Sequence, residues 1–150
     1  MLYTIGEVAG ILNIAPSTIR YYDKEGLLPF VERSAGGIRV FSESDLGWLK
    51  TISCLKSTGM PVKSIRNYVE SAMKGDETIE ERLEIIYEQR ERLLEQMKEL
   101  QRTLDIVEYK CWYYETARKE GTEEALKVMT LADIPEKYHA VIEHLHGKSG

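Results

Sequence analysis

The sequence predicts a mostly α-helical protein with a winged helix-turn-helix head, a two-helix extension and a long coiled-coil helix for dimerisation. Two observations lead to this prediction. Residues 5–41 follow the pattern of helix, turn, helix and then a glycine-containing hairpin. Residues 79–118 repeat apolar side chains with the period of a coiled coil. Two further helical segments lie between these regions.

The first two helices have clear start and stop signals. Residues 4–7, Thr-Ile-Gly-Glu, fit a capping box, in which the hydroxyl and the carboxylate each accept a backbone hydrogen bond at the helix start. Residues 13–15 then turn the chain. Pro16 suits the first position of the second helix because its missing N–H would have no partner there anyway, and Gly26 ends that helix. The positions expected to face the first helix are Ile19 and Tyr22.

A hairpin and two more helices are expected next. Between residues 27 and 41, the run Ser34-Ala35-Gly36-Gly37 is a turn signal between two short extended segments, which makes this region a candidate wing. Residues 42–45 can cap a third helix that runs to about residue 58. Gly59-Met60-Pro61 breaks it, and a fourth helix follows to about residue 74.

The long helix has the most regular periodicity in the chain. Ten of twelve positions in two interleaved seven-residue series are apolar, and charged or amide side chains fill most of the positions between them. At 1.5 Å per residue this seam is about 54 Å long. A small domain cannot cover such a strip, so we expect a second copy of the chain to cover it. The two series are Ile79, Ile86, Leu93, Leu100, Val107, Tyr114 and Leu83, Arg90, Met97, Leu104, Cys111, Arg118.

Gly121 ends the long helix, and two short helical pieces are expected at about 123–129 and 135–146, followed by a disordered end at 147–150. We therefore predict three parts. Residues 1–75 form the winged helix-turn-helix DNA-binding domain, 76–120 the dimerisation helix and 121–150 a short C-terminal effector or tail region.

Composition narrows the class of protein. No run approaches the roughly 18 apolar residues that a membrane span needs, and the N-terminus lacks the features of a signal peptide, so we expect a cytoplasmic protein with no membrane partner. Two cysteines are too few for a disulfide framework. The net charge of −5 is unevenly spread: residues 1–75 hold nine Lys and Arg against seven Asp and Glu. The front of the chain can therefore still approach phosphates.

Side chains able to contact DNA gather on the second helix and the wing. Arg20 can reach a guanine edge or a phosphate, and the hydroxyl of Tyr21 can donate to either. Basic residues on the wing are most simply phosphate contacts, which set register and not sequence. An ordinary solvated surface would present the same residue types. The predicted DNA-binding set is Ser17, Thr18, Arg20, Tyr21, Lys24, Arg33 and Arg39.

The ordered motifs resemble the MerR family of bacterial transcription regulators. The resemblance rests on residues 3–9, 19–23, 26–28 and 37–41 together with the long helix, and it covers the chain from residue 1 to about 120. Ile38 departs from the pattern, because members commonly carry an aromatic residue at this wing position.

The resemblance implies a homodimer held by an antiparallel coiled coil, with each head on one half of a palindromic operator. It also implies that the protein bends and untwists promoter DNA, so that RNA polymerase can engage promoter elements that are set too far apart.

Cys54 is the candidate effector-sensing residue. On a helical wheel it points nearly opposite the apolar stripe of the third helix, on the side of Lys50, which can favour a thiolate. Its position near a helix C-terminus opposes that effect. The placement of this cysteine resembles the thiol-reactive branch of the family, which implies modification of Cys54 by a small electrophile under aldehyde or nitrosative stress. A small residue packed against the partner chain is the alternative reading.

Other effector chemistries fit less well. Iron–sulfur members need four clustered cysteines, and thiolate metal sensors pair cysteines near the end of the long helix, where only Cys111 lies. We expect neither a metal site nor a cofactor. Residues 121–150 are too few to enclose a drug-sized pocket of about 300 Å³ alone.

Two alternatives to the electrophile-responsive regulator stay open at this point: a coiled-coil adaptor whose winged head binds protein, and a regulator that responds to a metal or a small ligand. An enzyme is not expected, because all three histidines lie at the far C-terminus and Cys54 has no His–Asp set nearby in the sequence.

Overall fold

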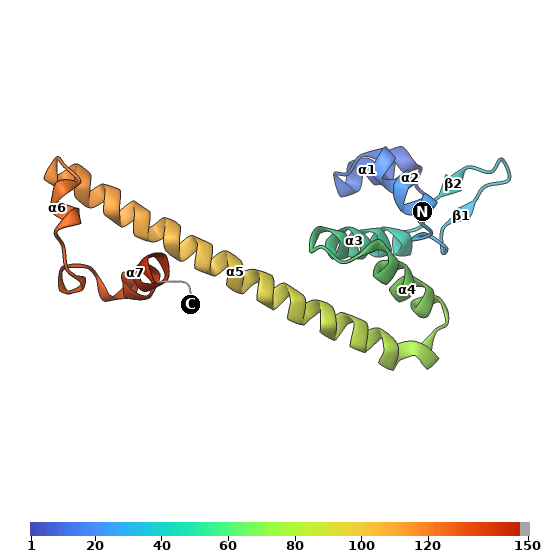
Figure 1. Ribbon diagram of the computed structural model, residues 1–150. Coiled ribbons are helices and arrows are strands. Elements are labelled where there is room, and N and C mark those ends of the chain that lie inside the picture. Colours follow the sequence, from blue (N-terminus) through green and yellow to red (C-terminus); the bar gives the residue numbers. More distant parts are fainter. Residues whose placement is uncertain (148–150) are drawn as a thin grey trace. The chain divides into compact units, whose positions relative to one another are not determined.

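The computed structural model of the protein describes residues 1–147, so the predicted disordered end lies outside the described residues apart from Gly147. The predicted fold class is confirmed: helices dominate, the strands form one small hairpin, and one helix is far longer than the rest (Figure 1). Contacts divide the chain into two compact units, Met1–Glu91 and Arg92–Gly150. The predicted boundaries after residues 75 and 120 divide the chain by function and stay predictions.

The helix-turn-helix consists of α1 (Ile5–Leu12) and α2 (Pro16–Lys24). The predicted capping box is present, because the backbone N–H of Glu7 donates to Thr4 Oγ1 at 3.3 Å and the N–H of Thr4 donates to Glu7 Oε2 at 2.7 Å. The turn after α1 passes through Asn13, whose φ of 53° lies in the left-handed region. Asparagine tolerates that conformation better than most residues, which explains the tight change of direction.

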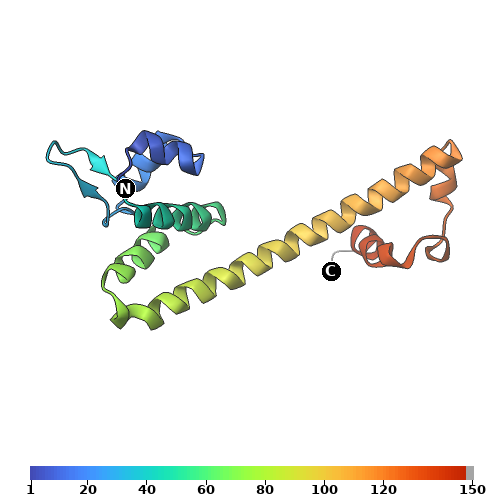
Figure 2. The same cartoon turned by 180° about the vertical axis from the view of Figure 1, so that it is seen from behind.

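The wing is a two-stranded antiparallel hairpin of β1 (Glu32–Arg33) and β2 (Arg39–Val40), in which Glu32 pairs with Val40 and Arg33 with Arg39. Its turn needs a glycine at residue 37, where φ is 78°. A further bridge joins Tyr3 to Phe41 through backbone hydrogen bonds of 2.8 and 3.0 Å, so the chain start closes the base of the wing. Figures 1 and 2 show the hairpin extending away from the helices of the head.

Two helices complete the head: α3 (Glu43–Ser57), which Ser42 and Asp45 cap, and α4 (Val62–Met73). The core of this unit gathers one apolar face from each helix together with the segment before the wing. Burying these side chains supplies the main stabilising free energy of the unit. The largest fully buried apolar side chains are Val8, Ile19, Leu27, Phe41, Leu49, Ile52, Ile65 and Val69.

The first turns of the long helix α5 (Ile79–Glu120) belong to the head unit. After the short 3-10 helix η1 (Asp76–Thr78), Ile85 packs on the core, and Gln89 Nε2 donates to Thr58 Oγ1 at 2.6 Å. Thr78 Oγ1 donates to the carbonyl of Ser71 at 2.5 Å. These contacts explain why the compact unit reaches residue 91 and does not end at the hinge.

In the second unit, the chain after α5 turns back so that α7 lies beside the helix (Figures 1 and 2). The segment comprises α6 (Glu124–Lys127), the 3-10 helices η2 (Leu131–Asp133) and η3 (Glu136–Tyr138), and α7 (His139–His146). Aromatic packing holds it to α5: the ring of Tyr138 lies 5.9 Å from Tyr109 and 5.7 Å from Trp112, between ring centroids. Across residues 1–147, no helix combines the length and apolar character that a membrane crossing requires.

Candidate nucleic-acid interface

One face of α2 carries the side chains predicted to read DNA. Ser17, Arg20, Tyr21 and Lys24 are all exposed, whereas Ile19 and Tyr22 are buried in the head. Positions three and four apart share a face of a helix, so this spacing aligns the exposed four along one stripe. Thr18 sits at the edge of the stripe and is half-buried. The stripe combines one guanidinium, one ammonium and two hydroxyl groups, which together suit phosphate and base-edge contacts.

The N-terminus of α2 adds the backbone N–H of Ser17 to this surface, because Pro16 has no N–H and the N–H of Thr18 donates to the carbonyl of Ala15 at 2.9 Å. Its N-cap residue, Ala15, makes no side-chain hydrogen bond to the first turn, and Pro16 occupies the start of the helix. The first N–H groups of a helix carry partial positive charge and bind anions when no side chain satisfies them. A phosphate oxygen is a suitable acceptor at this position.

The two arginines of the wing differ in the exposure of their side chains and in their partners. The side chain of Arg33 is 56% exposed, and its Nη1 donates to the carbonyl of Gly37 at 2.9 Å across the turn. The side chain of Arg39 is only 18% exposed and forms an ion pair with Asp23 on α2. Arg33 can therefore reach outward, whereas Arg39 is largely engaged within the head. Their predicted phosphate contacts stay predictions.

Asp23 is the residue of this surface that the sequence reasoning missed. Its carboxylate lies at the end of α2 and faces both wing arginines, with Arg33 Nη2 3.8 Å from Oδ2 and Arg39 paired to Oδ1. The sequence does hold a signal, because an acidic residue directly follows the basic and tyrosine residues of the predicted DNA-facing helix. A negative charge at that position opposes DNA binding unless a positively charged neighbour pairs with it.

The start of the chain is tied to α3 next to this surface. Tyr3 donates its hydroxyl hydrogen to Glu43 Oε1 at 2.6 Å. That hydrogen bond, with burial and the negative charges of Glu43 and Glu7 as smaller causes, raises the pKa of Tyr3 above its ordinary value of 10.0. The phenol therefore remains a neutral donor at physiological pH.

Cys54, the predicted effector-sensing residue, is exposed on α3. Its carbonyl accepts from the N–H of Thr58 at 3.2 Å and from Ser57 Oγ at 2.7 Å, so it belongs to the closing turn of the helix. Thr58 is also the acceptor for Gln89 of α5. A change at the Cys54 backbone can therefore reach the long helix through one intervening residue.

The predicted seam of α5 is uncovered in the single chain. Its apolar members are exposed along most of the helix, including Leu100 at 70% and Leu104 at 47%. The C-terminal segment packs on another side, where Tyr138 lies against the buried Tyr109. On a wheel of 100° per residue Tyr109 lies roughly opposite the seam positions nearby. The end of α5 thus has two apolar faces, of which the chain itself covers one.

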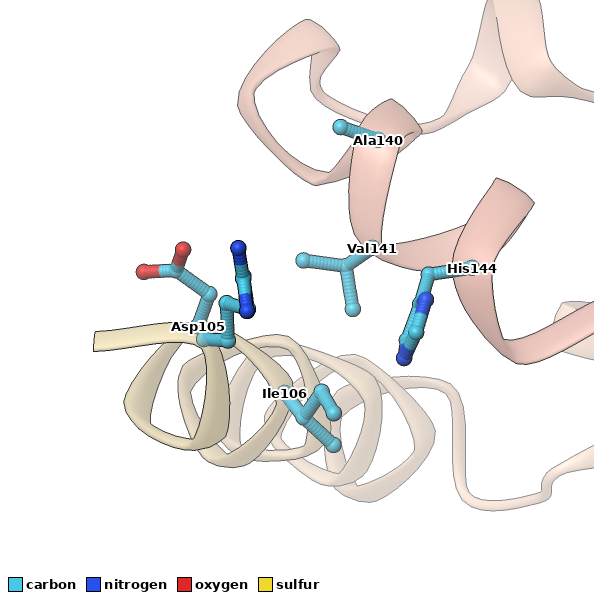
Figure 3. Close-up of a pocket in the computed structure, with 6 residues that line it drawn as sticks. Asp105, Ile106, Ala140, Val141 and His144 are labelled. Atoms are coloured by element: carbon cyan, nitrogen blue, oxygen red, sulfur yellow. The ribbon is translucent and has the colours of Figure 1, made fainter. Parts of the chain in front are cut away.

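A crevice of about 440 Å³ lies between α5 and α7, with Ile106 and Val141 forming its apolar floor (Figure 3). Its charged α5 side chains are engaged by neighbours on the same helix, since Arg102 Nη1 donates to Glu99 at 2.5 Å and Asp105 accepts from Gln101 at 2.8 Å. Within residues 1–147, no three or more His, Cys, Asp or Glu side chains come together as metal ligands would.

Comparison with known proteins shows which family this chain resembles. Residues 3–72 match the sequence model of the MerR HTH family of regulatory proteins, and residues 46–108 match that of the MerR DNA-binding region. An HTH-type transcriptional regulator of Haemophilus influenzae is 43% identical over 136 residues, which cover 91% of this chain and 98% of the relative. The HTH-type transcriptional regulator AdhR of Bacillus subtilis is 35% identical over 91 residues, covering 61% and 65% of the two chains.

A solved structure is similar over nearly the same region. The crystal structure of HiNmlR, a MerR family regulator lacking the sensor domain, bound to promoter DNA, superposes with a TM-score of 0.77 at 43% identity. The match covers 86% of this chain and 98% of that chain. The fold of this chain is therefore similar to that of a MerR family regulator whose crystal structure contains promoter DNA.

Proposed function

The chain belongs to the MerR family of helix-turn-helix transcription regulators, and on this premise we propose that it works as a homodimer on a palindromic promoter operator. It is a DNA-binding regulator and not an enzyme. One observation carries the proposal: the same chain has an exposed stripe of basic and hydroxyl side chains on α2 and an uncovered apolar seam on α5.

The dimer follows from the cost of leaving that seam in water. Burying apolar surface yields about 25 cal/mol per Å², and monomeric proteins rarely leave a long apolar strip exposed. A second copy of α5 supplies a matching strip, and the C-terminal segment does not cover this side of the helix. An antiparallel pairing places one head at each end of the coiled coil, which suits the two halves of a palindrome.

Within each head, α2 enters the major groove and the wing lies along the adjacent backbone. Arg20 and Tyr21 read base edges or phosphates at the centre of the stripe. The remaining members of the proposed contact set are Ser17, Thr18, Lys24, Arg33 and Arg39. Two heads spaced by about one turn of B-DNA contact successive major grooves on one side of the duplex.

Activation of transcription is proposed to proceed by deforming the promoter. A dimer that holds both half-sites can bend and untwist the segment between them, and the energy of that deformation depends on the sequence of the segment. RNA polymerase then engages promoter elements whose original spacing was too long. The relative HiNmlR is bound to promoter DNA in its crystal structure, which supports promoter DNA as the partner of this chain.

Cys54 is the proposed trigger. Its thiol is exposed, and it lies in the turn whose last residue, Thr58, accepts the hydrogen bond from Gln89. With formaldehyde, the sulfur forms a bond to the carbon and the thiol proton ends on the new hydroxyl, so the adduct needs no further reagent. Added bulk at this turn shifts α3 against α5 and so changes the orientation of the head.

The test combines operator footprinting with transcription in vitro, using wild type, Cys54→Ser and Cys111→Ser, each with and without formaldehyde, methylglyoxal or a nitrosothiol. Cys111→Ser is the matched control because it removes the other of the two cysteines. We expect all three proteins to protect a palindromic operator, and wild type and Cys111→Ser to respond to the electrophile. A normal response from Cys54→Ser excludes the thiol trigger, and a failure of wild type to protect any promoter site excludes operator binding.

A further inference from the structure

Both arms of the wing converge on one carboxylate of α2. Asp23 Oδ1 forms the ion pair with Arg39 of β2, and Oδ2 lies 3.8 Å from Nη2 of Arg33 of β1. The Asp23 side chain is itself only 25% exposed. The pair between Asp23 and Arg39, whose side chain is 18% exposed, is therefore less screened by water than a pair on an open surface.

The hairpin has little else to fix its direction. It contains two paired positions, and a two-stranded ribbon of that size is at best marginally stable alone. The bridge between Tyr3 and Phe41 anchors its base and not its turn. Arg33 Nη1 also holds the carbonyl of Gly37 at the turn, so a restraint on Arg33 is passed on to the end of the wing.

We propose that Asp23 is a positioning residue that holds the wing against the recognition helix in the orientation that DNA requires. It contacts no DNA itself. It orders the side chains of Arg33 and Arg39, and through them the hairpin, so that the wing and α2 meet the duplex as one preformed surface.

A competing effect has the opposite sign. A carboxylate beside a DNA-binding surface repels phosphates, and it also competes with phosphates for the two arginines. If repulsion dominates, removing the charge of Asp23 strengthens operator binding. If positioning dominates, removing it lowers the fraction of molecules with a correctly placed wing, and the apparent affinity falls by that fraction. The two readings therefore predict changes of opposite direction.

The experiment measures operator affinity by fluorescence anisotropy at fixed salt for wild type, Asp23→Asn and Glu32→Gln. Glu32 is the matched control because it is an exposed acid on β1 of the same wing. We expect Asp23→Asn to bind roughly tenfold more weakly, as a fall of the competent fraction to about one tenth implies. Glu32→Gln should bind as tightly as wild type or slightly more tightly, because it removes only repulsion.

Hydrogen exchange in the free protein gives a readout that affinity alone does not. The N–H groups of Ser34 and Gly37 are bonded within the turn, to the carbonyls of Ile38 and Ser34. Loss of the ion pairs should speed exchange at these amides, while protection of α1 and α2 remains. If exchange at the turn is unchanged in Asp23→Asn, the wing does not depend on this carboxylate and the proposal fails.

Arg39→Gln tests the same ion pair from the wing side, and it keeps the question answerable if Asp23→Asn folds poorly. We expect the double variant Asp23→Asn/Arg39→Gln to bind no more weakly than the weaker single variant, because the two residues act through one contact. Additive losses would show that Asp23 and Arg39 act independently of each other, and they would overturn the proposal. So would an Asp23→Asn variant that binds as tightly as wild type.

This inference rests on the DNA binding of the proposed function and uses no effector. The outcomes separate the two. If wild type and Glu32→Gln bind no operator duplex, the proposed function has failed. If both bind and Asp23→Asn matches them, operator binding stands and only the positioning role of Asp23 is lost.

Discussion

Shortening Leu100 to alanine is expected to weaken the dimer by roughly two orders of magnitude while leaving each head folded. Leu100 lies in the proposed seam and is 70% exposed in the single chain. The substitution removes three carbon atoms, worth about 0.8 kcal/mol each when they become fully buried, or about 1.7 kcal/mol at this exposure. A twofold dimer contains the change twice, so about 3.4 kcal/mol is lost, which is roughly a 250-fold rise in the dissociation constant.

A second seam position makes the argument quantitative. Leu104 is 47% exposed, so a partner chain buries less of its side chain than of Leu100. The same reasoning gives about 2.3 kcal/mol per dimer for Leu104→Ala, or roughly a 40-fold weaker dimer. The order of the two variants is therefore predicted as well as the direction.

Sedimentation velocity with fluorescence detection, from nanomolar to micromolar protein, measures the dissociation constants directly. Lys98→Ala is the control, because Lys98 is exposed and lies nearly opposite Leu100 around α5. It should dimerise within about threefold of wild type, as expected for a surface substitution. Equal effects of Leu100→Ala and Lys98→Ala, or a wild-type protein that stays monomeric at micromolar concentration, would refute the assignment of this seam as the dimer interface.

Three further predictions concern the head. Arg20→Ala should cost about 1–3 kcal/mol of operator affinity. If the affinity of the variant also depends less steeply on salt concentration, Arg20 contacts a phosphate, and if discrimination at one base pair is lost, it contacts a base. Unchanged affinity would contradict its role in DNA binding. Leu49→Ala removes a fully buried core side chain, and thermal melts should show a loss of about 2–5 kcal/mol, with the exposed neighbour Lys50→Ala close to wild type. Hydrogen bonds from the backbone and the hydroxyl of Thr4 lower the pKa of Glu7 below its ordinary 4.5. Because the folded-state pKa is the lower one, Glu7 stabilises the fold above pH 4.5 and loses this effect as the pH falls. Urea midpoints of wild type and Glu7→Gln should therefore converge between pH 6 and pH 3, and a constant difference would exclude the carboxylate as the cause.

Features that depend on near neighbours could be read directly from the residues. The capping boxes at Thr4 and Ser42 are both present, because a cap needs only the right side chain three positions from another. The exposed stripe of α2 follows from positions three and four apart on a helix. The exposed seam of α5 follows in the same way from its seven-residue repeat.

Contacts between distant residues could not be read this way. The convergence of Arg33 and Arg39 on Asp23 depends on where the wing lies relative to α2, which no local pattern in the sequence sets. The hydrogen bond from Gln89 to Thr58 spans 31 positions. The presence of an arginine or a glutamine does not predict such a contact, because both are ordinary surface residues wherever no partner comes within reach.

In the second unit, too, the features set by near neighbours could be predicted and the contacts between distant residues could not. Periodicity indicated a long helix with one apolar seam and short helical pieces after Gly121, and these elements are present. It did not indicate that Tyr138 packs on Tyr109 and Trp112, so that the end of α5 has a second apolar face, which the chain itself covers. The physical reason is that helix start, stop and face are set by interactions within one or two turns. Which faces meet is set by burial of the whole unit, where each contact becomes favourable only after the others have brought its partners together.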